Sequence, residues 1–169
     1  MCMKRCYLLL VCLCVILSSV SAQKVSEGSL QSLKNCGKVN VLLDFSDACI
    51  HGMTVEAFAE YEQDWEVDLP IISRKFVTGL IEKCPNVRFG TDSDTELTLK
   101  VKVLSITPKG DYRCEGILMN RQKDKIAYIS EVNARGGTFG SKLNLIKDGA
   151  EHTGEALGKF IKRTIQKIK

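Results

Sequence analysis

Three consecutive runs of residues with strand character constrain the fold of this chain more than any other feature. Polar and apolar residues alternate one by one over residues 95–103, and this two-residue period is typical of a strand with one face on a core. A Pro-Gly turn at residues 107–110 leads into a second run at 112–119, and a polar turn leads into a third at 126–132. The sequence therefore predicts an antiparallel three-stranded meander. Its first strand turns four apolar side chains to the core: Leu97, Leu99, Val101 and Val103.

Elements on either side of the meander complete the pattern. Residues 39–45 form a short apolar run rich in β-forming residues, which predicts a buried strand. Pro70 is well placed at the start of a helix that stops at residues 84–85, and the acidic segment 51–69 before it suits a solvated helix or loop. Apolar residues at three- and four-residue steps predict a terminal helix. Because glycines interrupt this pattern, we expect the helix to begin between residues 144 and 153.

This order of elements predicts one α+β domain with the arrangement β-α-β-β-β-α. The first strand, followed by a crossover helix, should run parallel to its neighbour in a mixed sheet, while the meander supplies antiparallel neighbours. Both helices should pack on one face of the sheet. We expect the domain to cover residues 39–169 and the polar residues 23–38 to form a flexible lead-in.

Residues 1–22 have the pattern of a secretory signal peptide. Lys4 and Arg5 form a charged start, residues 7–17 form an apolar stretch too short to span a membrane comfortably, and small residues precede a cleavage site after Ala22. We therefore expect the mature protein to be periplasmic or secreted. An uncleaved anchor is the alternative.

The charge balance of the mature chain argues against nucleic-acid binding. Removal of the signal peptide takes away Lys4 and Arg5, which leaves 22 of the 24 basic residues against 20 acidic ones and a net charge of +2. A nucleic-acid-binding protein would be expected to show a strong basic field. We therefore expect no nucleic acid as partner.

Four cysteines remain in the mature chain, in a compartment that favours oxidation: Cys36, Cys49, Cys84 and Cys114. An even number permits two disulfides in any of three pairings. Because Cys36 and Cys49 bracket the first predicted strand, that strand can hold them too far apart for a bridge, and we favour partners elsewhere. The alternative is four buried free thiols. No Cys or His spacing suggests zinc, so we expect no metal and no cofactor.

A cluster of reactive residue types lies at the carboxyl end of the first predicted strand. Asp44, Asp47, Cys49 and His51 bring together acid, thiol and imidazole groups, which could form a nucleophile with its base or a metal site. This gives the hypothesis of a small thiol-dependent hydrolase that uses Cys49 and His51, with Asp47 as a further catalytic candidate. No motif fixes the geometry of these groups. The alternative is a polar turn in which Asp47 caps and Cys49 is buried or bridged.

A glycine-rich loop after the third strand of the meander is a second candidate site. Gly136, Gly137, Gly140 and Lys142 are residue types that bind phosphates between a strand and a helix. Their spacing matches neither a Walker loop nor a GxGxxG fingerprint. The alternative is a mobile connection that needs glycine for its backbone conformation.

The terminal helix offers a third candidate surface. Lys159, Lys162 and Arg163 lie between its apolar residues and could rest on anionic lipid. Helices bound in this way usually carry larger apolar and aromatic residues, whereas this one has only Phe160. We therefore favour a solvated face over a membrane surface.

The arrangement resembles that of small exported envelope domains. The signal peptide, the strand at 39–45, a helix ending near Cys84, the meander, a Gly-containing loop and a terminal helix carrying Ala156–Ile161 are similar to the periplasmic domain of the curli secretion channel subunit and to the TolB amino-terminal module. This resemblance covers residues 39–169 and implies assembly or binding without catalysis. We therefore expect an exported domain that binds an envelope protein or a small ligand, through an exposed sheet edge or the Gly-rich loop. The thiol-dependent hydrolase is the alternative.

Overall fold

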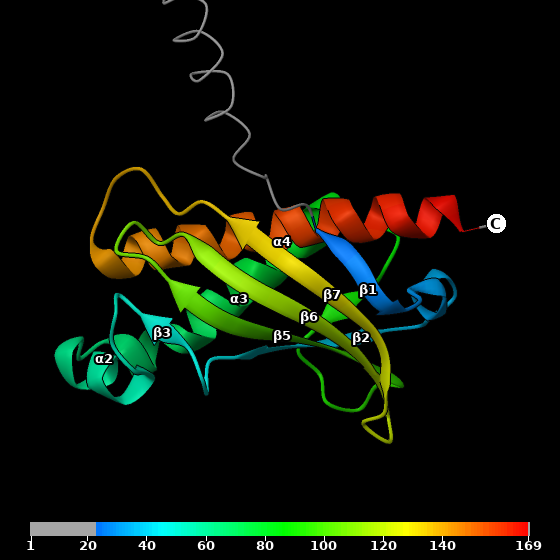
Figure 1. Ribbon diagram of the computed structural model, residues 1–169, viewed down its shortest axis with the longest axis horizontal. Coiled ribbons are helices and arrows are strands. Elements are labelled where there is room, and N and C mark those ends of the chain that lie inside the picture. Colours follow the sequence, from blue (N-terminus) through cyan, green and yellow to red (C-terminus); the bar gives the residue numbers. More distant parts are fainter. Residues whose placement is uncertain (1–22, 169) are drawn as a thin grey trace, which may run out of the picture.

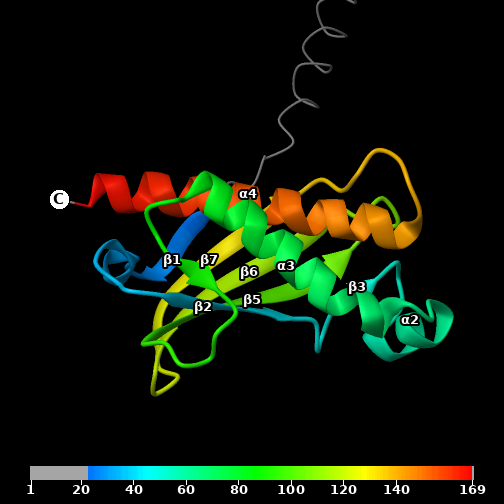
Figure 2. The ribbon, with the colours of Figure 1, turned by 180° about the vertical axis from the view of Figure 1, so that it is seen from behind.

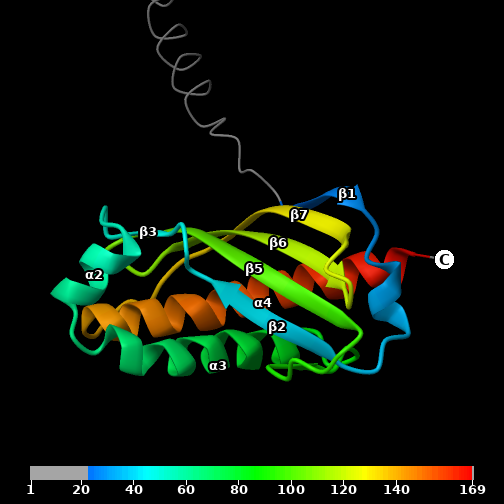
Figure 3. The same ribbon diagram turned by 90° about the horizontal axis from the view of Figure 1, so that it is seen from below.

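The computed structural model describes residues 23–168, which form one mixed β-sheet with two long helices packed on one of its faces (Figures 1 and 3). Six of the seven strands lie in the order β1-β7-β6-β5-β2-β4, and the seventh, β3, pairs with the end of β5. This confirms the predicted α+β class. The elements are β1 Lys24–Gly28, η1 Gln31–Lys34, β2 Val39–Asp44, β3 Cys49–Ile50, α2 Val55–Tyr61, α3 Trp65–Lys83, β4 Phe89–Gly90, β5 Leu97–Ile106, β6 Tyr112–Asn120, β7 Lys125–Ala134 and α4 Lys142–Lys167.

The predicted meander is present as β5, β6 and β7. Neighbouring strands pair antiparallel along their length, and buried side chains alternate with half-buried ones along β5. Leu99, Val101 and Val103 are 0% exposed. Lys100 and Lys102 lie on the opposite face, as expected for an antiparallel sheet with one solvated side.

β2 joins the meander as a parallel strand, which confirms the predicted crossover topology. Residues Val39–Asp44 are in register with Leu97–Lys102 of β5. On its other side, β2 pairs with β4 only at Val39 and Asn40. The rest of β2 is therefore an open edge of the sheet, and α3 runs alongside this edge (Figure 3).

Glycines let α3 and α4 pack closely against each other on one face of the sheet, which Figure 2 shows with the helices in front of the strands. A Cβ atom on Gly79 of α3 would lie 2.2 Å from the carbonyl oxygen of Glu151 in α4. A Cβ atom on Gly154 of α4 would lie 2.0 Å from the carbonyl oxygen of Phe76 in α3. The backbones of α3 and α4 can approach each other this closely only because Gly79 and Gly154 carry no side chain.

The terminal helix α4 begins shortly before the predicted range. Ser141 caps the helix, because its side chain accepts a hydrogen bond from the N–H of Asn144 at 3.3 Å, and the first helical residue is Lys142. The predicted start is wrong because intrinsic helix propensity counts Gly149 and Gly154 only as residues that weaken a helix. Both are buried in packing contacts that stabilise it.

The helix α3 also begins earlier than predicted, at Trp65, so Pro70 lies inside it. The ring of Trp65 packs edge to face against Phe45 and Phe58, with centroids 5.5 and 5.2 Å apart. This burial stabilises the extra turn, although Pro70 removes one internal hydrogen bond. The helix ends as predicted at Cys84, whose N–H donates to the Leu80 carbonyl at 3.0 Å.

The polar segment before β2 forms regular structure, which corrects the expected flexible lead-in over residues 23–38. β1 pairs antiparallel with β7, and the hydroxyls of Ser26 and Ser130 are hydrogen-bonded at 2.8 Å. Leu30 and Leu33 are 0% and 1% exposed, so η1 is anchored in the core. Most residues of this segment are polar, which is why the sequence predicts a flexible segment. The burial of Leu30 and Leu33 nevertheless holds it against the core.

The fold therefore begins at β1, before the domain boundary predicted at residue 39. The predicted signal peptide, residues 1–22, lies outside the described residues. Within residues 23–168, no helix is both long enough and apolar enough to cross a membrane.

Candidate functional site

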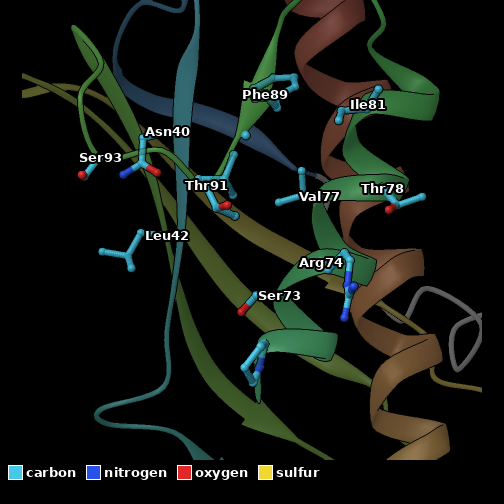
Figure 4. Close-up of a pocket in the computed structure, with 13 residues that line it drawn as sticks. Asn40, Leu42, Ser73, Arg74, Val77, Thr78, Ile81, Phe89, Thr91 and Ser93 are labelled. Atoms are coloured by element: carbon cyan, nitrogen blue, oxygen red, sulfur yellow. The ribbon is translucent and has the colours of Figure 1, made fainter. Parts of the chain in front are cut away.

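A groove of about 950 Å³ runs between the open edge of β2 and the helix α3 (Figure 4). The segment at and after β4 closes one end of it. Apolar, hydroxyl and amide side chains line the groove together with a single charged one: Asn40, Val41, Leu42, Pro70, Ser73, Arg74, Val77, Thr78, Ile81, Phe89, Gly90, Thr91 and Ser93.

The backbone of β2 is available along this groove. Val39 N–H donates to the Arg88 carbonyl on the β4 side at 2.8 Å. Because successive N–H groups of a strand point to opposite sides, the N–H of Leu43 also points to the β4 side, beyond the last residue that β4 covers. Within residues 23–168, the N–H and carbonyl of Leu43 have no hydrogen-bond partner on that side. The groove thus has one wall that can pair with another strand.

The opposite wall of the groove is apolar. Figure 4 shows Val77 and Ile81 directed from α3 towards Phe89 and the strands. Ile81 is 42% exposed, whereas Val77 and Phe89 are 8% and 6% exposed. Leu42, 48% exposed, points away from α3 on the other side of β2 (Figure 4). Exposed apolar groups beside an open edge favour a binding surface over a solvated one.

Arg74 supplies the only charge in the lining of the groove. Its side chain is exposed and forms no ion pair with any residue between 23 and 168. A guanidinium presents a fixed set of N–H donors that match a carboxylate or a phosphate. The groove therefore suits an extended apolar segment with an acidic group opposite Arg74.

The acidic candidates at the end of β2 are paired with lysines of the neighbouring strand β5. Asp44 Oδ2 lies 2.7 Å from Lys100 Nζ, and Asp47 Oδ2 lies 2.7 Å from Lys102 Nζ. The hydrogen bond from Lys100 lowers the pKa of Asp44 to about 2. Asp44 and Asp47 are thus held on the solvated face of the sheet, separate from His51, which packs against α2.

The structure does not bring the Cys49 thiol and the His51 imidazole together in a hydrogen bond. His51 packs edge to face on Phe58 with ring centroids 5.0 Å apart, and its Nε2 is buried without a partner among the described residues. Burial, with the nearby charge of Lys142, lowers the pKa of His51. Cys49 is exposed at the start of β3. The thiol-dependent hydrolase stays a prediction that this geometry does not support.

The glycines of the candidate phosphate loop use their N–H groups within the fold. Gly136 N–H donates to the Asp111 carboxylate at 2.8 Å, and Gly137 N–H donates to the Leu145 carbonyl at 3.4 Å. A Cβ atom on Gly136 would lie 1.9 Å from the backbone of the β5–β6 turn. These contacts favour a structural role for both residues.

The remaining loop candidates lie at the start of α4. Gly140 has a φ of +127°, a conformation that favours glycine. The ammonium group of Lys142 lies 4.2 Å from the ring centroid of Tyr61 and hydrogen-bonds to its hydroxyl. Lys142 therefore links α4 to α2, and a phosphate-binding role for this loop stays a prediction.

All four cysteines of the described chain are free thiols, so the predicted disulfides are not formed. Cys49 is exposed and Cys36 half-buried, which also differs from the alternative of four buried thiols. Cys84 and Cys114 are buried, and burial raises the pKa of both. No group of three or more His, Cys, Asp or Glu in residues 23–168 could hold a metal ion.

The basic flank of α4 surrounds a hollow of about 420 Å³ beside the end of α3. Lys159 and Lys83 each lie 3.6 Å from the Glu155 carboxylate, which offsets part of their charge. Lys162 and Arg163 also line the hollow. A membrane-surface role for this flank stays a prediction.

The fold and the groove define a small α+β domain with an open sheet edge at β2. No family model matches the chain, and no curated protein matches it. Two solved structures of PelC dodecamers from Paraburkholderia phytofirmans, one of them a point variant, are similar to it with TM-scores of 0.44 and 0.43. Both are 10% identical to this chain in sequence. The alignments cover 82% and 81% of this chain and 98% of the PelC chain.

Proposed function

We propose that the protein is an exported, non-catalytic binding module of the cell envelope that takes up an extended segment of a partner protein in the groove between β2 and α3. One observation carries this proposal: the backbone of Leu43 lacks a strand partner on the β4 side, next to Leu42, which lines the groove. Open strand edges are templates for pairing with another chain.

A partner segment that pairs with β2 as an added strand would contact both walls of the groove. The partner segment pairs with the open edge of β2 through main-chain hydrogen bonds, which supply affinity for any extended chain. Alternate side chains of the segment then point towards α3, where Val77 and Ile81 select apolar residues. Arg74 adds a preference for an acidic residue at one position.

Site-specific photo-crosslinking tests this assignment. A photo-reactive phenylalanine analogue replaces Thr78, an exposed residue in the groove, and the cells that make the protein are irradiated. The same analogue at Phe139, an aromatic residue 87% exposed in the Gly-rich loop, is the matched control. Mass spectrometry then identifies the crosslinked segment.

We expect an adduct from position 78 whose crosslinked segment alternates apolar residues and carries an acidic one. The exchange Ile81→Glu should abolish this adduct by placing a charge in the groove, whereas Phe139→Glu should leave it intact. No adduct at position 78, or the same adduct at both positions, would contradict the proposal.

A further inference from the structure

A second site with different chemistry lies at the end of the meander. Ser105 of β5 is opposite Arg113 of β6, which in turn is opposite Asn133 of β7. All three side chains are exposed or half-buried, while their buried neighbours along each strand face the helices. Together with Arg135 they line a hollow of about 530 Å³ that shares no lining residue with the groove.

The polar side chains of this row are available to a ligand. None of the four has a side-chain hydrogen bond or an ion pair within residues 23–168. Lysines on the same face of the sheet are paired instead, Lys100 with Asp44 and Lys102 with Asp47, at 2.7 Å each. Two guanidinium groups at one hollow repel each other, and a bound anion removes that repulsion.

The one acidic residue at the hollow is already engaged. Asp111 accepts a hydrogen bond from Gly136 N–H at 2.8 Å and another from the Thr107 hydroxyl at 2.9 Å. The bond from Gly136, then that from Thr107 and the charges of Lys109 and Arg135, hold its pKa below the ordinary value. The lining therefore keeps an excess of positive charge.

We propose that this hollow binds a phosphoryl group. Each arginine can donate two parallel N–H bonds to an oxyanion, and two arginines match the two charges and several oxygens of a phosphate monoester. The Ser105 hydroxyl and the Asn133 amide supply neutral donors beside them. A carboxylate, with one charge and two oxygens, uses only part of this set.

Titration of the folded protein with inorganic phosphate tests the proposal, with amide chemical shifts as readout. Acetate at matched ionic strength is the ligand control. We expect saturable shifts at residues 105, 113, 133 and 135 with phosphate, and an affinity about tenfold lower in Arg113→Gln and in Arg135→Gln. Arg121→Gln, at an exposed position of the turn between β6 and β7, should bind phosphate as the native protein does.

Vesicles distinguish the two sources of a phosphoryl group. If the protein sediments with phosphatidic acid vesicles but not with phosphatidylcholine vesicles, and Arg113→Gln no longer sediments with them, the phosphoryl group belongs to a lipid headgroup. Phosphate binding without vesicle binding indicates a soluble phosphate ester. Equal shifts with acetate, the absence of saturable shifts, or equal losses in Arg121→Gln would overturn the proposal.

Discussion

Gly154 in α4 lies against the carbonyl oxygen of Phe76 in α3, where a Cβ atom would approach to 2.0 Å. No real Cβ atom comes this close to a backbone oxygen, so a side chain at position 154 must force the two helices apart. We predict that Gly154→Ala lowers the free energy of unfolding by about 1–3 kcal/mol, measured by urea denaturation.

Gly37 provides the control for this exchange. A Cβ atom there meets no other atom within 4 Å, and its φ lies outside the left-handed region. We expect Gly37→Ala to change the free energy of unfolding by no more than about 0.5 kcal/mol. Equal losses in the two variants would show that close helix packing is not the cause.

Residue periodicity was sufficient to predict most of this fold. The two-residue alternation of 95–103 follows from burial on one face of a sheet, and the structure shows that burial in β5. The helix starts were less predictable because tertiary contacts decide them. Trp65 extends α3 through its aromatic neighbours, and Gly149 and Gly154 stabilise α4 by allowing close packing, which intrinsic helix propensity does not record.

The groove could not be predicted in the same way. An exposed sheet edge was expected, but only strand pairing shows that β4 covers two residues of β2 and leaves Leu43 open. The one sequence signal is Leu42, an apolar residue that alternation places on the face opposite Val41. Ile81 belongs to the apolar pattern of α3. This pattern does not show that the side chain is 42% exposed in the folded protein.

The ion pair between Lys147 and Asp68 joins α4 to α3 in a half-buried setting. Lys147 Nζ donates to Asp68 Oδ2 at 3.0 Å, and the two side chains are 19% and 12% exposed. We predict that Lys147→Met lowers the free energy of unfolding by about 1–3 kcal/mol, because the Asp68 carboxylate loses its partner while staying largely out of water. Thermal or urea denaturation measures the loss.

The exposed pair of Arg121 and Asp94 is the matched comparison. Its side chains are 69% and 88% exposed, so Arg121→Met should change stability by less than about 0.5 kcal/mol. If Arg121→Met were as destabilising as the exchange at Lys147, burial would not explain the effect.

Asp44 makes the stability of the protein sensitive to acid. The hydrogen bond from Lys100 lowers its pKa in the folded state to about 2, from an ordinary value of 3.8. Because the folded-state pKa is the lower one, the ionised carboxylate stabilises the fold fully above about pH 4, and this stabilisation is lost as the pH falls towards 2. We predict that Asp44→Asn costs about 1–2 kcal/mol near neutral pH and progressively less in acid. Urea denaturation across this range tests it, and a cost independent of pH would contradict the assignment.

The cysteines should differ in reactivity according to burial. Cys49 is exposed, whereas Cys84 and Cys114 are 0% and 1% exposed. We predict that a maleimide labels Cys49 rapidly in the folded protein and labels Cys84 and Cys114 only after unfolding, as read by peptide mass spectrometry. Labelling of Cys114 at the rate of Cys49, or a Cys49 already held in a disulfide, would contradict this description of the thiols.

Hydrogen exchange at the Leu43 amide tests the strand-addition mechanism most directly. In the free protein this N–H faces the open edge of β2, while that of Leu42 faces β5. After the segment identified by crosslinking is bound, we predict that exchange at Leu43 slows by about a hundredfold or more, while exchange at Leu42 changes little. An unchanged exchange rate at Leu43 in the saturated complex would show that the partner does not pair with β2.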